Sequence, residues 1–113
     1  MNDWLDRVKF DRHGLVAAVV QDAIDKSVLM LGYMNAESIQ KTLMTRKVTF
    51  WSRSRKQLWT KGETSGHFLN LVGMYLDCDG DAILVKAKPI GPTCHTQKKS
   101  CFSWQLVEQG FEE

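Results

Sequence analysis

Residues 69–88 have the sequence LNLVGMYLDCDGDAILVKAK, and this stretch decides the fold. Two apolar runs, 69–78 and 82–88, flank Asp79-Gly80, the kind of dipeptide that tight hairpin turns favour. Successive side chains of a strand point to opposite faces. One face of the first run is therefore predicted to carry Val72, Met74, Leu76 and Cys78, and the other Leu71, Gly73, Tyr75 and Asp77. The stretch predicts a β-hairpin.

Outward from this hairpin, the chain alternates between strand patterns and turns. Runs rich in β-branched and apolar residues predict strands at residues 15–21, 28–34, 48–52 and 56–60. The first two of these are separated by a short polar segment, so they are expected to form a second hairpin. Residues 61–67 and 91–103 predict loops, and a short closing element is expected to begin with Phe102, Trp104, Leu106 and Val107.

Helical signals are few. Asn35 is a suitable N-cap, Glu37 lies in the first turn, and Ile39 and Leu43 are four residues apart on one face, so residues 36–45 predict a short helix. Residues 4–12 fit either a short helix or an extended arm. The expected fold class is α+β and strand-dominated, with a small mixed or antiparallel, barrel-like sheet and one or two short helices.

Size and charge exclude several classes of protein. The chain has 113 residues, enough for one hydrophobic core, so a single domain over residues 1–113 is expected. A net charge of +2 is too small to indicate nucleic-acid binding by field strength alone. There is no apolar run of the roughly 20 residues that a membrane span needs, and no signal-peptide pattern. A cytoplasmic protein with reduced thiols is expected.

Three cysteines, Cys78, Cys94 and Cys101, stand apart from any C-x-x-C knuckle. Taken singly, each could be a small buried hydrophobe. However, Cys94 and Cys101 lie in a polar, basic segment, and such surroundings favour the thiolate, the form that binds zinc. Three protein ligands with one open position are typical of catalytic zinc, where a bound water becomes a nucleophile. If His95 supplied a fourth ligand, the site would instead be structural.

An acidic triplet, Asp77, Asp79 and Asp81, surrounds the first cysteine. It is not an EF-hand loop, because the glycine comes too early and the twelfth position is Lys88. Three carboxylates at alternate positions repel one another unless a cation lies between them. The triplet fits either a magnesium site or a solvated turn equally well.

Two polar segments follow each other closely, residues 51–56 and 61–67. Arginine forks, hydroxyls and glycine backbone are the groups that bind phosphate, so an anion pocket is favoured over two ordinary surface turns. The second segment lacks the ending of a Walker A loop. His67 could carry a proton or simply be a hydrogen-bonded histidine.

Taken together, six segments resemble one family closely: the phosphoribosyl-AMP cyclohydrolases of histidine biosynthesis. The matching segments are residues 14–22, 28–35, 50–55, 58–67, 77–81 and 94–102. They are long, occur in the family's order, and extend over nearly the whole chain from Phe10 to Phe102.

The resemblance implies a reaction and a set of sites. Water would add at C6 of the adenine ring of 1-(5-phosphoribosyl)-AMP and open the N1–C6 bond. Some members of the family carry a fused pyrophosphohydrolase domain, and the form without that domain is expected here. The implied zinc ligands are Cys78, Cys94 and Cys101, drawn from both subunits of an intertwined homodimer. The implied Mg²⁺ ligands are Asp77, Asp79 and Asp81.

The remaining substrate contacts are hypotheses. His67 is the candidate for proton transfer. The candidate substrate-binding residues are Trp51, Arg53, Arg55, Lys61, Thr64 and Ser65, with all but Trp51 assigned to the phosphates.

Two other classes of protein remain open on the residues alone. One is a zinc-stabilised RNA- or nucleotide-binding module, which the tryptophans and arginines near residues 50–59 would serve through stacking and phosphate contacts. The other is a redox-sensing thiol protein, which would need an exposed cysteine pair at short spacing. The cyclohydrolase prediction differs from both in expecting an open zinc position, a small nucleotide as partner, and no nucleic acid or membrane.

Overall fold

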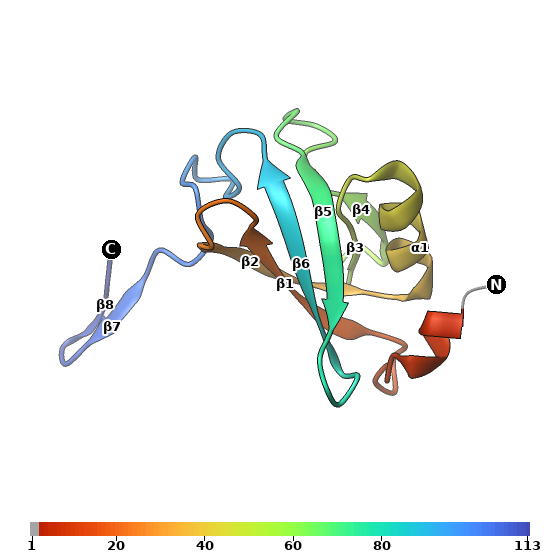
Figure 1. The fold of residues 1–113 in the computed structure, drawn as a ribbon. Helices are drawn as coiled ribbons and strands as arrows, with labels where there is room; N and C mark the ends of the chain where they lie inside the picture. Colours follow the sequence, from red (N-terminus) through yellow and green to blue (C-terminus); the bar gives the residue numbers. More distant parts are fainter. Residues whose placement is uncertain (1–2) are drawn as a thin grey trace.

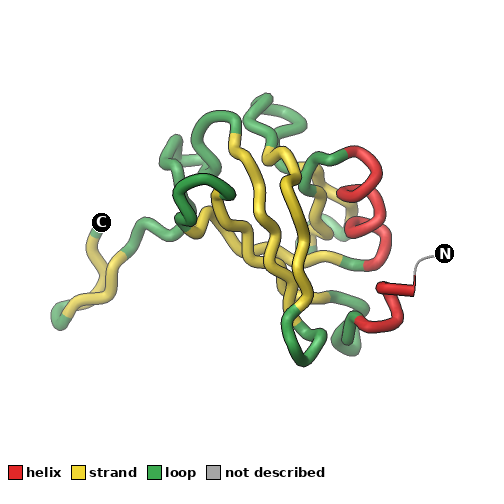
Figure 2. Tube along the Cα trace, in the orientation of Figure 1, coloured by secondary structure: helices red, strands yellow, loops and turns green. Residues whose placement is uncertain are grey.

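The computed structural model describes residues 3–113 and is dominated by strands (Figures 1 and 2). In chain order the elements are η1 (Asp3–Arg7), β1 (Val16–Asp22), β2 (Val28–Met34), α1 (Ala36–Thr45), β3 (Thr49–Ser52), β4 (Gln57–Thr60), β5 (Leu69–Leu76), β6 (Ala82–Pro89), β7 (Gln105–Val107) and β8 (Gly110–Glu112). The predicted fold class, α+β with a mixed sheet, is confirmed. Within the described part of the chain, no helix has the length and apolar character needed to cross a membrane.

The main sheet has four strands in the order β2-β1-β6-β5. Strand β1 pairs antiparallel with β2 and parallel with β6, and β5 and β6 form the hairpin predicted from residues 69–88. The hairpin β3–β4 and helix α1 lie together beside the sheet, to the right of β5 in Figure 1. The parallel contact between β1 and β6 joins segments that lie far apart in the sequence, so no turn signal marks it.

Helix α1 begins and ends as its sequence predicts. The Asn35 side chain accepts a hydrogen bond from the Ser38 backbone N–H, and the Ser38 hydroxyl accepts one from the Asn35 N–H, which completes a capping box. Ile39 and Thr42 are buried on the helix face that meets β3. Thr42 Oγ1 also accepts from the Thr49 N–H at 2.9 Å, so the helix is tied to the start of β3.

The core lies between the sheet and the β3–β4 layer. Phe50, Leu29, Met34, Leu69 and Val85 are among its fully buried side chains. A Cβ atom at position 32 of β2 would come within 2.6 Å of the Phe50 ring. A glycine is therefore required there, because any side chain would displace the largest core residue.

The predicted faces of β5 hold from Gly73 to Leu76 but are wrong for Leu71 and Val72. A β-bulge lies between Leu71 and Gly73, and it leaves Val72 54% exposed. One extra residue shifts the alternation of side chains by one position. As a result Leu71, Met74 and Leu76 all contact the core, where strict alternation would have placed Leu71 opposite the other two.

The C-terminal residues form a hairpin, β7–β8, but they do not close the fold. This hairpin pairs with no other described strand and projects away from the body of the molecule, at the left of Figure 1. Its secondary structure agrees with the predicted closing element, whereas its position does not. Of the residues predicted to begin this element, Phe102, Trp104 and Leu106 are exposed and Val107 is half-buried.

Candidate metal and nucleotide site

The loop between β6 and β7 brings Cys94 and Cys101 together. The Cys94 N–H donates to the Lys98 carbonyl at 3.0 Å, and the Gln97 N–H donates to the Cys94 carbonyl at 3.0 Å. Gln97 adopts φ 71°, which closes this tight turn. The chain then returns so that the Cys101 thiol lies close enough to Cys94 for each to affect the pKa of the other. Two of the three predicted zinc ligands are therefore neighbours in one chain.

The cysteine loop is anchored on the β1–β2 hairpin. The Cys101 N–H donates to the Leu29 carbonyl at 2.7 Å, and the Ser100 hydroxyl donates to the Val28 carbonyl at 2.7 Å. The Lys99 ammonium pairs with Asp25 and, at 3.4 Å, with Asp22. These contacts hold the two thiols in a defined position relative to the sheet.

The two thiols have different proton affinities. Hydrogen bonds from Thr96, whose hydroxyl lies 3.0 Å from Sγ, lower the pKa of Cys94. Desolvation, followed by the neighbouring Cys94, raises the pKa of Cys101. The positive charge of Lys61 favours the thiolate form of both. Such a pair, in which one thiol has a lowered pKa and a cation lies nearby, is chemically suited to bind a soft metal such as zinc.

His67 lies beside the same loop. A Cβ atom at Gly91 would come within 2.8 Å of the His67 ring, so the imidazole packs directly on the backbone that leads to Cys94. The backbone N–H of His67 donates to the Ser65 hydroxyl at 3.1 Å. The structure thus brings His67, Lys61 and the cysteine pair to one end of the molecule.

The loop over residues 61–67 depends on Gly62. This residue has φ +88°, and an added Cβ would lie 2.4 Å from the carbonyl carbon of His67. The Gly66 N–H donates back to the Gly62 carbonyl at 2.7 Å, which closes the loop. Thr64 and Ser65, the predicted phosphate ligands, are exposed at its tip.

The predicted arginines lie on the turn between β3 and β4. The Arg53 guanidinium stacks 3.9 Å from the centre of the Tyr33 ring, while Arg55 is exposed. Trp51 is half-buried on β3. Lys61 lies 5.4 Å from the centre of the Trp59 ring as well as near the thiols, so its predicted role in phosphate binding is not its only possible one.

The acidic triplet occupies the turn between β5 and β6. Ligand atoms of Asp77, Cys78 and Asp79 lie within 4.8 Å of one another, and all three residues are exposed. A hydrogen bond to Asp77 raises the pKa of Asp81. Gly80 is fixed from outside the turn, because its carbonyl accepts from the Lys9 N–H at 2.7 Å and a Cβ there would lie 2.5 Å from the Arg7 carbonyl oxygen.

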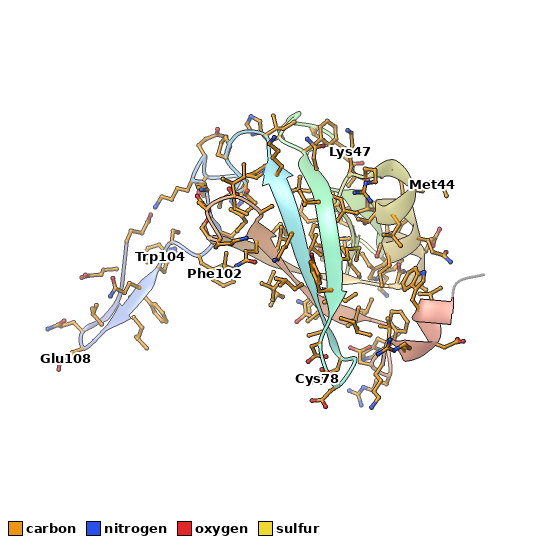
Figure 3. The ribbon with its side chains drawn as sticks, viewed as in Figure 1. Met44, Lys47, Cys78, Phe102, Trp104 and Glu108 are labelled. Carbon is orange, nitrogen blue, oxygen red and sulfur yellow. The ribbon has the colours of Figure 1, made fainter. Side chains whose placement is uncertain are left out.

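The three cysteines do not meet within one chain. Among residues 3–113, the only cluster of three or more potential metal-binding side chains is Asp77, Cys78 and Asp79. Figure 3 labels Cys78 at the foot of the sheet and Phe102, which follows Cys101, well away from it. His95 is exposed and completes no four-ligand set with the cysteine pair in the described residues. A single chain therefore presents two incomplete sets of ligands.

Several site residues could not be recognised from their sequence patterns. Asp22 and Asp25 belong to a segment with an ordinary polar turn pattern, yet they hold Lys99 of the cysteine loop. Tyr33 belongs to an apolar strand pattern, yet it supports Arg53. No local sequence signal marks these residues, because each contacts a partner that lies far away in the chain.

Comparison with known proteins defines first a class and then a family. The class is that of the cyclohydrolases: residues 30–103 match the family described as Phosphoribosyl-AMP cyclohydrolase. The chain is 52% identical to the phosphoribosyl-AMP cyclohydrolase of Roseobacter denitrificans, over 96% of the chain and 84% of that protein. It is 56% identical to the one from Bifidobacterium longum, over 85% of the chain and 73% of that protein. The chain belongs to the phosphoribosyl-AMP cyclohydrolase family.

Longer proteins also match. The histidine biosynthesis bifunctional protein HisIE of Vibrio cholerae is 55% identical over 96% of the chain. The chain spans about half the length of this bifunctional relative, 51%. The similarity thus extends over almost the whole chain in both kinds of relative.

Proposed function

We propose that this protein hydrolyses 1-(5-phosphoribosyl)-AMP in histidine biosynthesis, opening the N1–C6 bond of the adenine ring. The observation that carries the proposal is the pairing of Cys94 with Cys101 beside Lys61 and His67. The names of the relatives give the class of reaction, and this cluster supplies the chemical groups that it needs: a soft metal-binding pair, a cation and a titratable ring.

The metal-binding part of the proposal follows from the ligand types. Cys94 and Cys101 would hold zinc together with Cys78 of the partner subunit, because one chain cannot assemble the set. Zinc with an open position supplies a Lewis acid that makes water nucleophilic near neutral pH. Asp77, Asp79 and Asp81 would hold Mg²⁺, a hard cation that prefers carboxylate oxygens and retains several waters.

The other residues would bind and orient the nucleotide. Lys61, Thr64 and Ser65 lie on the loop that follows β4, beside the thiols, and Arg53 and Arg55 lie on the turn at the other end of β4, so the two groups can take the two phosphates of the substrate. Trp51 offers a ring face for stacking against a base. His67, fixed against Gly91, would transfer a proton to the ring nitrogen that leaves carbon.

The first experiment compares Cys94→Ser with the wild-type protein. The variant is expected to lose both bound zinc, measured by elemental analysis, and turnover of 1-(5-phosphoribosyl)-AMP, measured by absorbance. Gln97→Ala, in the same turn, serves as the matched control and should retain zinc. Wild-type kcat in zinc-free Cys94→Ser protein would refute the proposed role of the metal.

A second experiment tests whether the ligands come from two subunits. Cys78→Ser and Cys94→Ser chains are unfolded together and refolded as a mixture. Half of the dimers should be mixed and each should hold one intact site, so about a quarter of wild-type activity is expected in a two-fold symmetric dimer. If the mixture is as inactive as its separate components, the ligands are not shared.

A further inference from the structure

Among the described residues, the C-terminal hairpin pairs with no other strand, and Glu113 at its end forms an ion pair with Lys98 of the cysteine loop. We call residues 102–113 the C-terminal arm. Its large apolar side chains are mostly in solvent: Phe102 is 63% exposed, Trp104 61%, Leu106 68% and Phe111 67%. An isolated two-stranded hairpin is at best marginally stable in water. An arm whose hairpin has strands of only three residues and which exposes four such side chains is expected to require a surface to pack against.

A second apolar surface lies elsewhere on the molecule. A groove of about 510 Å³ runs between η1, α1 and the β5–β6 hairpin. Its lining includes Trp4, Leu43, Met74, Tyr75 and Leu76. Tyr75 is 53% exposed and Leu43 38% exposed, so the groove is open to solvent. We call it the η1–α1 groove, and a large open apolar surface of this kind is typical of an interaction site.

The two surfaces are adjacent, in sequence, to the two halves of the proposed zinc site. The arm begins at Phe102, immediately after Cys101, and the β5 residues of the groove end at Leu76, two residues before Cys78. If Cys101 of one subunit and Cys78 of the other bind one metal ion, the start of the arm must lie close to the partner's groove. This step rests on the proposed function.

Charge favours the same pairing. The arm contains Glu108, Glu112 and Glu113 and no basic residue, and Glu113 is paired with Lys98 of its own chain, which leaves Glu108 and Glu112 to face a partner. Of the nine side chains that line the groove, the only charged one is Arg7. An acidic arm and a groove with a single cation are complementary, and opposite charges across an interface fix orientation more than they add affinity.

We propose that the C-terminal arm of each subunit packs into the η1–α1 groove of a second copy of this chain. The exchange is reciprocal, as a two-fold interface requires, because each subunit contributes one arm and one groove. Trp104 is the anchor, since large aromatic side chains contribute most to such contacts. The arm thereby holds Cys101 and the partner subunit's Cys78 in register.

A photo-cross-linking experiment tests the contact directly. The benzophenone amino acid p-benzoylphenylalanine replaces Trp104 in the full-length protein, and cross-linked peptides are identified by mass spectrometry after mixing isotopically light and heavy chains. We expect mixed-isotope cross-links to peptides that contain Leu43 or residues 74–76. Cross-links only within one chain, or only to other surfaces of the second copy, would overturn the proposal.

Matched variants test the energetics. Trp104→Glu and Leu43→Glu are each expected to raise the dimer dissociation constant at least about tenfold in sedimentation velocity, as for anchors at the centre of an interface. The controls are Gln109→Glu, in the arm's exposed turn, and Met44→Glu, which is 81% exposed next to Leu43 but does not line the groove. Equal dissociation constants in variants and controls would overturn the proposal.

The result can be separated from the test of the proposed function. Complementation between Cys78→Ser and Cys94→Ser chains reports only whether the metal ligands are shared. Successful complementation with cross-links that avoid the groove would refute the arm contact and leave the shared site intact. Failed complementation together with cross-links to the groove would refute the shared metal site and support the arm contact.

Discussion

The loop beside the thiols should be unusually sensitive to a single methyl group at Gly62. In Gly62→Ala, the new Cβ would lie 2.4 Å from the His67 carbonyl carbon and 2.5 Å from the Phe68 nitrogen. Both atoms belong to the backbone, so no change of side-chain rotamer can relieve the contact. The same loop contains Gly66, which has a similar φ, +81° against +88°, but no neighbour within 4 Å of its Cβ position. An alanine at either position has the strain of a positive φ, but only an alanine at Gly62 also clashes with the backbone. Comparing the two variants therefore separates the cost of the backbone strain from the cost of the clash.

The expected magnitudes follow from these two differences. A left-handed conformation costs a residue with a Cβ about 1–2 kcal/mol, and the loss of glycine's freedom in the unfolded chain returns about 0.4–1 kcal/mol. Gly66→Ala should thus lower the free energy of unfolding by roughly 1 kcal/mol. Overpacking adds about 1–3 kcal/mol, so Gly62→Ala should lose about 2–4 kcal/mol or move the loop.

Urea unfolding of both variants and of the wild-type protein provides the measurement, and turnover provides a second one. Because the contact is with His67 itself, kcat should fall in Gly62→Ala and stay close to wild type in Gly66→Ala. Equal losses of stability in the two variants, with equal kcat, would refute the reasoning. They would show that the cost of an alanine in this loop comes from the positive φ and not from the contact with the His67 backbone.

Three further changes have defined expectations. In Gly91→Ala the new Cβ would displace the His67 ring, and kcat should fall by about 10- to 100-fold in steady-state assays. In Tyr33→Ala the Arg53 guanidinium loses its aromatic support, worth about 0.5–1 kcal/mol, so KM should rise about two- to fivefold. The pKa of Asp22 is lowered from 3.8, mainly by the hydrogen bond from the Ile24 N–H. The Asp22 carboxylate therefore stabilises the fold above pH 3.8, and this stabilisation is lost as the pH falls below that value. Asp22→Asn should therefore unfold at lower urea than wild type at neutral pH, and the difference should shrink in strong acid.

Each of these expectations has its own control. Gly14→Ala has a similar positive φ with no neighbour within 4 Å, so it should not change kcat. Tyr33→Phe keeps the ring face, so KM should match that of the wild-type protein. An Asp22→Asn difference that stays constant from neutral to acid pH would show that the charge of Asp22 does not stabilise the fold.

The local parts of the fold could be predicted because their signals are local. Asn35 caps α1 through a residue three positions away, and Asp79-Gly80 forms its turn within four residues. The bulge after Leu71 could not be predicted, because it depends on how β5 pairs with β6 and not on any residue type in β5 alone. The same holds for the parallel pairing of β1 with β6.

The candidate site shows the same division. The three cysteines could be predicted as metal ligands from the sequence, and so could the basic, polar surroundings that favour the thiolate form of Cys94 and Cys101. The position of the cysteine loop was not, because it is fixed by contacts such as Lys99 with Asp25, which lie 74 residues apart. The separation of Cys78 from the other two thiols also depends on the whole topology, since strand β6 and the loop after it lie between them.

Gly80 has a consequence for anyone who redesigns this protein. The Lys9 and Arg7 backbone holds it from outside, so the path of the β5–β6 turn is set by main-chain atoms and tolerates no side chain at that point. The carboxylates on either side are exposed, and their restriction is milder: the Asp77 carboxylate accepts a hydrogen bond from the Asp81 N–H within the turn. A library that seeks a different cation preference should therefore randomise positions 77, 79 and 81 and leave position 80 constant. Most of its members would then keep the wild-type scaffold.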